Sequence, residues 1–287
     1  PTLSTWGLAP SGAEILPGGE KAARSRLRDC LKNRLRRYRP ERDIPSANAT
    51  SRLSQDLRFG TLSIRTILSE VNKVTEGGSQ AAKESAGTYI SELAWREFYM
   101  QILAHFPSVL ELEFNPDYRG LPWDEADERL DAWKKGLTGF PFVDAGMREL
   151  RSTGFMHNRV RMVTAMFLCK DLHQDWRLGE QFFMQQLLDG EIASNNGGWQ
   201  WSAGTGADAA PYFRIQNPWT QGKRHDPEGT YIRQWIPELA EVPAKLLHAA
   251  PDNGHAIAPG YPAPIVDHGR ERERTLRIFK EHLAQSR

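Results

Sequence analysis

The amino-acid sequence predicts an all-α fold. Apolar residues recur at spacings of three and four through long stretches of the chain, which is the period of a helix that buries one face. Alternating runs of β-branched residues are few, and proline and glycine divide the chain into stretches of helical length. With 39% hydrophobic residues, the 287-residue chain can bury the core of one large domain or of two small ones.

The first helix is predicted over residues 20–38, because Leu27, Leu31 and Leu35 recur at every fourth position. Its other faces are rich in arginine, and for these faces a solvated surface is favoured over a contact with DNA. The proline at position 40 is expected to end the helix.

Hydroxyl groups cluster in the next stretch, Thr50-Ser51-Arg52-Leu53-Ser54. Hydroxyls and main-chain amides at the start of a helix can hold an anion such as a phosphate. Capping of the helix itself is the commoner use of these residue types. The residues alone leave both interpretations open.

A strong helix is predicted over residues 85–106. Beside its apolar stripe, Glu92, Trp95, Arg96 and Tyr99 lie on one arc, at spacings of three and four. A carboxylate, an indole and a guanidinium on one strip could bind a base-like ligand by hydrogen bonding and stacking. The alternative is a Glu92–Arg96 ion pair beside a core tryptophan.

Two shorter helices are predicted over residues 123–136 and 143–150. The first ends at a glycine, and a turn at Phe140-Pro141-Phe142 precedes the second. The stretch that follows, 154–201, is the most informative part of the sequence. Its first helical segment places Asn158, Arg161 and Met162 one turn apart, so that they share a face.

The second helical segment of this stretch covers residues 176–188, and the sequence DGEIASNNGG follows it. Asp189, Glu191 and Asn195 lie too close to the apolar run to be ordinary loop residues. The two glycines that follow are expected to allow tight backbone geometry ahead of two tryptophans. A helix end with its cap and two core tryptophans is the alternative.

The C-terminal part adds local positive charge and two further helices. Lys223, Arg224 and Arg233 are the basic residues. Asp226 is expected to cap a helix that runs through Trp235 and is closed by a proline. A proline- and glycine-rich stretch separates this helix from a final charged helix over positions 271 to 286.

Composition excludes several classes of protein. The net charge of +1 means that a nucleic-acid site must be a local basic patch. The two cysteines form no disulfide framework or zinc pattern, so no metal is expected and a reducing, cytoplasmic location is predicted. The apolar run MVTAMFLC is too short to span a bilayer, and no secretory signal is expected. The run GTGADA lacks the strand and the third glycine of a dinucleotide fingerprint.

The motifs ELAWREFY, MHNRVRM, DGE-x-A-x-NNGGWQW and TGADAAPYFRIQNP resemble the photolyase/cryptochrome family, most closely its microbial class I cyclobutane pyrimidine dimer photolyases. The match runs in order from about Tyr38 to about Leu239. It implies an all-α FAD-binding domain over residues 20–287, behind a proline- and glycine-rich linker at residues 1–19. The α/β antenna domain of the family is expected to be absent from this chain, and with it the antenna pigment.

The resemblance implies FAD as the cofactor, with FADH⁻ as its active form. Arg161 and Asp189 are expected to form an ion pair at the flavin, and Asn195 to hydrogen-bond near the flavin N5. Glu191 stands where the family commonly has a second aspartate, so its carboxylate reaches one methylene further. The expected cofactor-binding residues are Tyr38, Thr50, Ser51, Arg52, Leu53, Ser54, Trp95, Arg96, Asn158, Arg161, Asp189, Gly190, Glu191 and Asn195.

The resemblance also implies light-driven DNA repair. An electron passes from the excited flavin to a pyrimidine dimer, the cyclobutane ring opens and the electron returns; photolyases as a class flip this target out of the duplex. Trp95 and Trp201 are expected to sandwich the dimer, with Glu92, Asn158 and Met162 at its edge and face. The expected DNA contacts are Arg42, Glu92, Trp95, Arg96, Tyr99, Asn158, Arg159, Met162, Trp201 and Arg214, of which Arg42, Arg159 and Arg214 form a basic rim.

Nine tryptophans are many for a chain of this length. The family reduces its flavin through three tryptophans, and the resemblance assigns Trp199 as the nearest to the flavin, Trp176 as the middle member and Trp133 as the outer one. Large aromatic residues are more often core material, so packed indoles are the alternative.

Rival functions are a cryptochrome-type photosensor, a (6–4) photoproduct lyase and a helical DNA-binding module without flavin. Asn195 and Met162 are what a repair enzyme of the family carries, whereas (6–4) lyases have histidines at the positions of Asn158 and Met162. Leu110-Glu111 stands where some folate-using members have Cys-Lys, so no folate is expected. The expected partner is DNA that contains pyrimidine dimers, bound by a monomer, with no membrane contact.

Overall fold

The computed structural model describes residues 3–7, 12–251 and 254–285. Within this part of the chain the regular structure is helical, and the only strand-like feature is one isolated bridge between Asp124 and Gln174. The predicted all-α fold is therefore confirmed. Among the described helices, none is long and apolar enough to cross a membrane.

The helices follow one another with short connections. The α-helices are α1 (Glu20–Asp29), α2 (Tyr38–Glu41), α3 (Ser54–Arg58), α4 (Ile64–Thr75), α5 (Gln80–His105), α6 (Glu128–Lys135), α7 (Pro141–Thr153), α8 (Asn158–Lys170), α9 (Trp176–Gln186), α10 (Ile192–Ala203), α11 (Pro218–His225), α12 (Thr230–Trp235), α13 (Ala244–Leu247) and α14 (His268–Gln285). Single turns of 3₁₀-helix are η1 (Leu3–Trp6), η3 (Leu35–Arg37), η4 (Pro45–Ala47), η5 (Pro107–Leu110), η6 (Pro116–Tyr118) and η7 (Pro237–Leu239).

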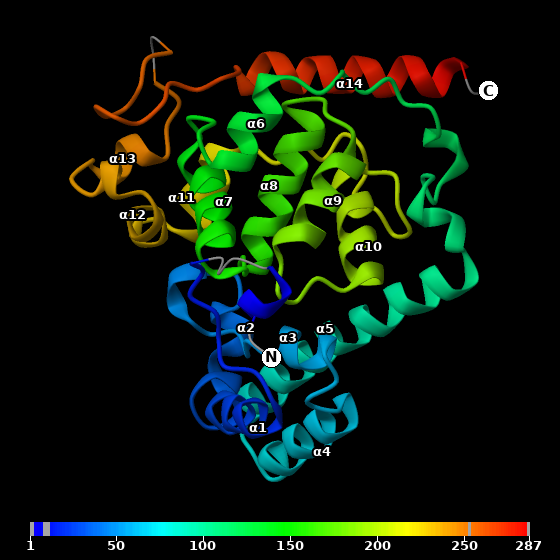
Figure 1. Ribbon diagram of the computed structural model, residues 1–287, viewed down its shortest axis with the longest axis vertical. Helices are drawn as coiled ribbons and strands as arrows, with labels where there is room; N and C mark the ends of the chain where they lie inside the picture. The colour runs from blue at the N-terminus through cyan, green and yellow to red at the C-terminus, as the bar shows by residue number, and fades with distance from the viewer. Residues whose placement is uncertain (1–2, 8–11, 252–253, 286–287) are drawn as a thin grey trace.

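Two hydrophobic cores hold the helices together. One core draws on residues 23–93, from α1 to the first half of α5, and the other on residues 130–261. In Figure 1 the first group of helices lies below and α6 to α10 lie above, with α14 running across the top. Helix α5 packs against α2 and α4 at one end and against α10 at the other, so it links the two groups.

The first predicted helix is divided by a π-helical turn, Cys30–Arg34. Side chains at every fourth position rotate by about 40° per step around a regular α-helix. A wider π turn offsets this drift, and it leaves both Leu27 and Leu35 in the core. Pro40 does not end the helical segment, contrary to expectation. A new helix, α2, begins at Tyr38, and in its first turn a missing N–H costs nothing.

Helix α6 starts five residues later than predicted. The carboxylate of Asp127 accepts a hydrogen bond from the Arg129 main-chain N–H at 3.0 Å, which makes Asp127 the N-cap. Gly136 ends the helix in the left-handed conformation, as predicted. Asp226 also acts as expected, since its carboxylate accepts hydrogen bonds from two main-chain N–H groups in the first turn of α12.

Gly197 and Gly198 lie inside α10 and not in a break before it, which corrects the sequence prediction. A Cβ atom on Gly197 would lie 2.0 Å from Cδ1 of Tyr99 on α5. Glycine is therefore required here for the close approach of two helices rather than for a turn.

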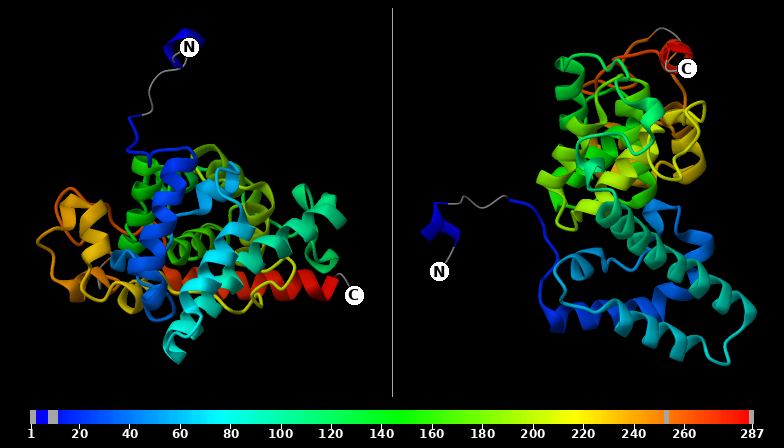
Figure 2. Two further views of the ribbon diagram at one scale, coloured as in Figure 1. Left: turned by 90° about the horizontal axis from the view of Figure 1, so that it is seen from below. Right: turned by 90° about the vertical axis from the view of Figure 1, so that its right-hand side faces the viewer.

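The expected linker is described only in part, because residues 1–2 and 8–11 lie outside the described residues. The main-chain N–H of Glu14 donates a hydrogen bond to the Ser152 carbonyl at 2.9 Å, which ties this segment to α7. Helix η1 stands apart from the rest of the molecule (Figure 2). The final predicted helix is present as α14, and Ser286 lies beyond the described residues.

A buried carboxylate fixes the turn ahead of α7 to the C-terminal part of the chain. Asp144 has no exposed surface, and it accepts hydrogen bonds from the N–H and the hydroxyl of Thr138 at 2.8 and 2.7 Å and from the Gly139 N–H at 3.0 Å. The Tyr261 hydroxyl donates a fourth hydrogen bond at 2.5 Å. Burial raises the pKa of Asp144, which these donors partly oppose.

We predict that Asp144→Ala lowers the free energy of unfolding by about 3–5 kcal/mol, because it leaves several buried donors without an acceptor. Urea denaturation followed by circular dichroism measures this loss. Asp131→Ala, at an exposed position of α6, is the control and should stay within about 0.5 kcal/mol of the wild type. Equal losses in the two variants would contradict the structural role of Asp144.

Candidate functional site

A cavity of about 490 Å³ is lined by residues from both groups of helices, and its volume is in the range of ligand pockets. Most of the residues selected from the sequence converge there: Tyr38, Arg42, Thr50, Ser51, Arg52, Leu53, Ser54, Glu92, Trp95, Arg96, Tyr99, Asn158, Arg161, Met162, Asp189, Glu191 and Trp201. The sequence analysis did not select seven further lining residues: Leu57, Tyr89, Leu93, Phe155, Met156, Ser194 and Gly198.

One side of the cavity is the arc that was predicted on α5. Glu92 does not pair with Arg96, as the alternative interpretation required. Its carboxylate accepts a hydrogen bond from Nη1 of Arg42 at 2.6 Å, whereas Arg96 pairs with Glu97 at 2.9 Å. Arg42 also lies 5.4 Å from the centre of the Tyr38 ring. The carboxylate of Glu92 is therefore fixed by Arg42 at the end of α2, whereas Arg96 is paired within α5.

The hydroxyl stretch forms a second side, and helix capping does not account for it. The N-cap of α3 is Leu53, which has no capping side chain, and all five residues of the stretch line the cavity. Arg52 adopts the left-handed conformation with φ = 57°, which is uncommon for a residue other than glycine. A left-handed main chain beside several hydroxyls on the cavity wall is suited to holding a phosphate group, the first of the two interpretations.

The predicted ion pair between Arg161 and Asp189 is present. Nη2 of Arg161 lies 2.9 and 3.0 Å from the two carboxylate oxygens, and its Nε donates to the Met156 carbonyl at 2.7 Å. The Asp189 side chain is only 3% exposed, so the pair is held largely away from water. Such a desolvated, hydrogen-bonded pair keeps a fixed charge arrangement at the cavity wall.

Phe155 lies between two guanidinium groups, and sequence reasoning missed it. Cζ of Arg52 lies 3.5 Å from the centre of the ring, and Cζ of Arg161 lies 5.3 Å from it. Burial lowers the pKa of Arg52, while Glu149, 4.0 Å away, opposes that shift. The only signal in the sequence was an aromatic residue next to the start of α8.

Three of the expected cofactor residues are bonded to other parts of the protein. The amide Nδ2 of Asn195 donates to the carbonyl and to Oε1 of Glu180 at 3.0 and 3.1 Å, and Asn195 does not line the cavity. Glu191 does line it, but its carboxylate caps α10 by accepting from the N–H groups of Ala193 and Ser194 at 3.0 and 2.9 Å. Gly190 contributes its carbonyl to Arg58 at 2.5 Å.

Trp199 and Trp176 are brought together by α9. Trp199 is 2% exposed, and its ring packs so closely on Gly179 that a Cβ there would lie 2.1 Å from Cη2. Gly179 is three residues after Trp176 on the same helix, and hence on the same face. The Trp176 indole is also buried and donates to Glu113 at 3.2 Å.

Trp133 does not have the surface position expected of an outer relay member, because none of its side chain is exposed. It contacts Trp199 directly, with ring centres 6.0 Å apart, and its Nε1 donates to the Thr164 carbonyl. Trp123 is partly exposed and packs on the same core. Its neighbour Asp124 donates through its main-chain N–H to the His173 carbonyl at 2.8 Å, which places Trp123 near the start of α9.

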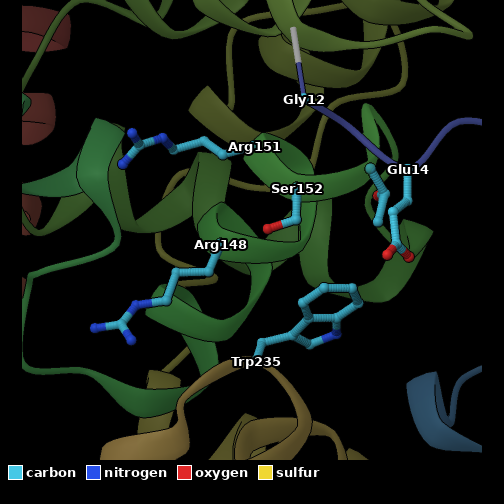
Figure 3. A pocket seen from close by; sticks show the side chains of 7 residues that line it. Gly12, Glu14, Arg148, Arg151, Ser152 and Trp235 are labelled. Atoms are coloured by element: carbon cyan, nitrogen blue, oxygen red, sulfur yellow. The ribbon is translucent and has the colours of Figure 1, made fainter.

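The three arginines of the expected basic rim lie in different settings. Arg42 lines the cavity, whereas Arg159 is outside it and pairs with Asp43 at 2.8 Å. Arg214 is exposed on the connection between α10 and α11. Figure 3 shows a second, open hollow, where the side chains of Arg148 and Arg151 point away from Glu14. None of the expected cofactor- or DNA-binding residues lines this hollow.

The cavity suits FAD by its chemistry. It combines hydroxyls and strained main chain for a diphosphate, an arginine–aspartate pair for a polar ring and leucines with aromatic residues for apolar contacts. Gly198 lines it, and a Cβ there would meet no atom within 4 Å, so a side chain at this position would enter the open space. Among the described residues, no cluster of potential metal ligands is present.

Comparison with known proteins identifies the domain. Residues 89–281 match the family model described as the FAD binding domain of DNA photolyase. The deoxyribodipyrimidine photo-lyase of Escherichia coli is 47% identical over 270 residues, which are 92% of this chain and 56% of that protein. The chain therefore spans little more than half the length of this relative.

Two solved structures are similar to this chain. The class III photolyase from Agrobacterium tumefaciens superposes with a TM-score of 0.90 at 38% identity, over 98% of this chain and 61% of the other. A Synechocystis cryptochrome gives a TM-score of 0.81 at 36% identity, over 91% of this chain and 56% of the other. The chain belongs to the DNA photolyase family, and what it comprises is the helical FAD-binding domain of that family.

Proposed function

We propose that this domain carries out light-driven repair of pyrimidine dimers in DNA. The observation that carries the proposal is the composition of one cavity. Residues suited to a flavin dinucleotide, such as Arg161 and Asp189, share this cavity with a polar and aromatic group suited to two joined pyrimidines of one strand: Glu92, Trp95, Tyr99, Asn158, Met162 and Trp201. Cofactor and substrate would then meet within a single site.

FAD in its reduced form would supply the light-excited electron donor. The residues of this chain bind, orient and exclude water. Trp95, 40% exposed and 6.0 Å from Tyr99 between ring centres, offers a flat apolar face at the cavity entrance on which a flipped-out base can stack. Glu92, held by Arg42, presents a carboxylate that accepts hydrogen bonds from the edge of that base.

Asn158 and Met162 support repair of cyclobutane dimers. They are one turn apart on α8, with Nδ2 of Asn158 4.0 Å from Sδ of Met162, and both face the cavity. An amide and a thioether make a mixed polar and apolar wall that matches the edge and face of paired pyrimidines. A photosensor would share the fold and the flavin, and it is distinguished by the absence of repair.

We predict that the flavin-loaded, reduced protein repairs a dimer-containing oligonucleotide under blue light. The variant Glu92→Ala should repair it roughly 10- to 100-fold more slowly, because a charged hydrogen-bonding group at the substrate is lost. Its flavin absorbance should be unchanged. Glu84→Ala is the matched control, because Glu84 is also on α5 and also pairs with an arginine, Arg39, away from the cavity. Flavin binding without any repair by the wild type would favour the photosensor. Normal repair by Glu92→Ala would show that the substrate site is misplaced.

The cofactor side of the cavity can be tested separately. We predict that Arg161→Ala weakens retention of FAD by about 2–3 kcal/mol, because the buried carboxylate of Asp189 is left unpaired. Flavin content after gel filtration and a titration of the apoprotein with FAD measure this loss. Arg148→Ala, which breaks the distant Arg148–Glu238 pair, should leave FAD retention unchanged. Retention equal to that of the wild type in Arg161→Ala would exclude this ion pair from the cofactor site.

We also propose an electron relay that runs from Trp199 through Trp176 to Trp123. Its support is the contact of Trp199 with α9, the position of Trp176 on that helix and the partial exposure of Trp123, since the outer member must meet the external reductant. Trp133 is not proposed as the outer member of this relay, because its side chain is completely buried.

We predict that light-driven reduction of the oxidised flavin is at least about tenfold slower in each of three variants, Trp199→Phe, Trp176→Phe and Trp123→Phe. Repair by the chemically reduced protein should be kept, because a Trp→Phe change preserves most of the buried apolar area. Absorbance after a blue flash, with external reductant present, gives the rate. Trp133→Phe is the matched control and should retain fast reduction. If flavin reduction were slow in Trp133→Phe and fast in Trp123→Phe, Trp133 would be the outer member of the relay, as expected from the sequence.

A further inference from the structure

Lys170, the last residue of α8, has no exposed surface. Its Nζ donates to the carbonyl of Tyr212 at 3.2 Å and lies 3.5 Å from the carbonyl of Arg214. Both carbonyls belong to the connection between α10 and α11, residues 204–217, called the rim loop below. The cavity does not include Lys170, and no function described so far uses it.

The buried ammonium group of Lys170 is compensated by two carbonyls and by the ring of Phe279, whose centre lies 6.0 Å from Nζ, and not by a carboxylate. Within the described chain, no carboxylate oxygen lies within 4.0 Å of Nζ, and the neighbouring Asp171 is paired with His268 at 2.5 Å instead. Burial lowers the pKa of Lys170 to about 8. An apolar residue would avoid this desolvation cost, so the hydrogen bonds to the rim loop are what the lysine contributes.

The two ends of the rim loop have anchors of their own: the Thr205 carbonyl accepts from the Asn115 N–H at 3.0 Å, and the Gln216 N–H donates to Sδ of Met166 at 3.1 Å. The segment between them, residues 211–215, has fewer. Its internal main-chain bonds are single turns, Arg214 N–H to the Pro211 carbonyl at 2.8 Å and Ile215 N–H to the Phe213 carbonyl at 3.1 Å. The side chains of Phe213 and Arg214 are exposed. The ring of Tyr212 stacks on Phe279 of α14, with ring centres 5.5 Å apart, and meets the ring of Phe213 edge-on at 5.6 Å.

Lys170 lies beneath both ends of this loop. A Cβ on Gly204, where α10 ends, would be 3.5 Å from Nζ of Lys170. The loop borders the cavity, because it follows directly on α10 with Trp201, and because Asp208 adds to the burial that raises the pKa of Tyr99 to about 12. The main chain that carries Arg214 is therefore bonded to one buried cation on the side of the loop away from solvent.

We propose that Lys170 is a positioning residue: its buried ammonium group pins the rim loop through the Tyr212 and Arg214 carbonyls and so holds Arg214 toward a DNA phosphate beside the cavity. The fixing of the rim loop by Lys170 follows from the contacts alone, whereas the contact of Arg214 with DNA rests on the proposed function.

The test is Lys170→Met in the flavin-loaded protein, because methionine keeps the length of the side chain and removes the charge and the donors. Hydrogen-exchange mass spectrometry should show exchange at residues 211–216 faster by roughly tenfold, with α8 and α10 unchanged. The Kd for a dimer-containing duplex should rise by roughly tenfold at unchanged flavin content. Lys170→Gln, which keeps an N–H donor, should lie between wild type and Lys170→Met in both measurements.

Thr275→Val is the matched control. The Thr275 hydroxyl donates to the Lys170 carbonyl at 2.6 Å, so this variant disturbs the same α8–α14 contact without touching the loop carbonyls. It should lower the thermal midpoint while exchange in the rim loop stays at the wild-type rate. Unchanged loop exchange in Lys170→Met, or equal acceleration in Thr275→Val, overturns the proposal.

The two levels of the inference separate in the same experiment. If the wild type does not bind dimer-containing DNA but Lys170→Met still loosens the rim loop, the proposed function fails, whereas the role of Lys170 in fixing the loop is kept. The other outcome concerns Arg214. If the wild type binds dimer-containing DNA, and Lys170→Met loosens the loop but binds this DNA with the same Kd as the wild type, the role assigned to Arg214 is overturned.

Discussion

The structure depends on how closely α10 approaches α5 and α9. Two glycines permit this approach: Gly197 against the ring of Tyr99, and Gly179 against the ring of Trp199. In both places a methyl group would lie about 2 Å from a ring carbon, so any larger residue would separate the helices. Because α10 carries Gly198 and Trp201 on the cavity wall, both the shape of the cavity and the tryptophan contacts follow from this packing.

Polar interactions join the two groups of helices around the cavity. Arg159 on α8 pairs with Asp43, and Arg58 on α3 donates to the carbonyl of Gly190. Arg52 lies near Glu149 of α7, a buried carboxylate whose pKa is raised by burial and which accepts a hydrogen bond from Tyr231 at 2.6 Å. Partly buried charges with fixed partners provide a preorganised environment for a bound cofactor, at a cost in desolvation that the two apolar cores must offset.

Local sequence signals predicted the presence of helices that bury one apolar face, and they predicted the residues at which helices begin and end less well. The period of α5 and the glycine after α6 were sufficient to locate both helices. The π turn after α1 depends on which leucines reach a core whose other residues come from elsewhere in the chain. The start of α6 is set by a local hydrogen bond, from the Arg129 N–H to Asp127, which the sequence prediction overlooked. The role of Gly197 in α10 was misjudged because its contact is with Tyr99, almost a hundred positions earlier in the chain.

The sequence by itself determined the helical class, since periodicity is a local property that survives without coordinates. Most residues of the cavity followed from the resemblance of the sequence motifs to the photolyase/cryptochrome family. Only the tertiary structure decided which charges pair and which aromatic side chains meet. Glu92 pairs with Arg42 rather than Arg96, Asn195 is held by Glu180, and Trp133 is buried where a surface position was expected. The physical reason is that pairing and exposure depend on distances between segments far apart in the chain, which are fixed only when the helices pack.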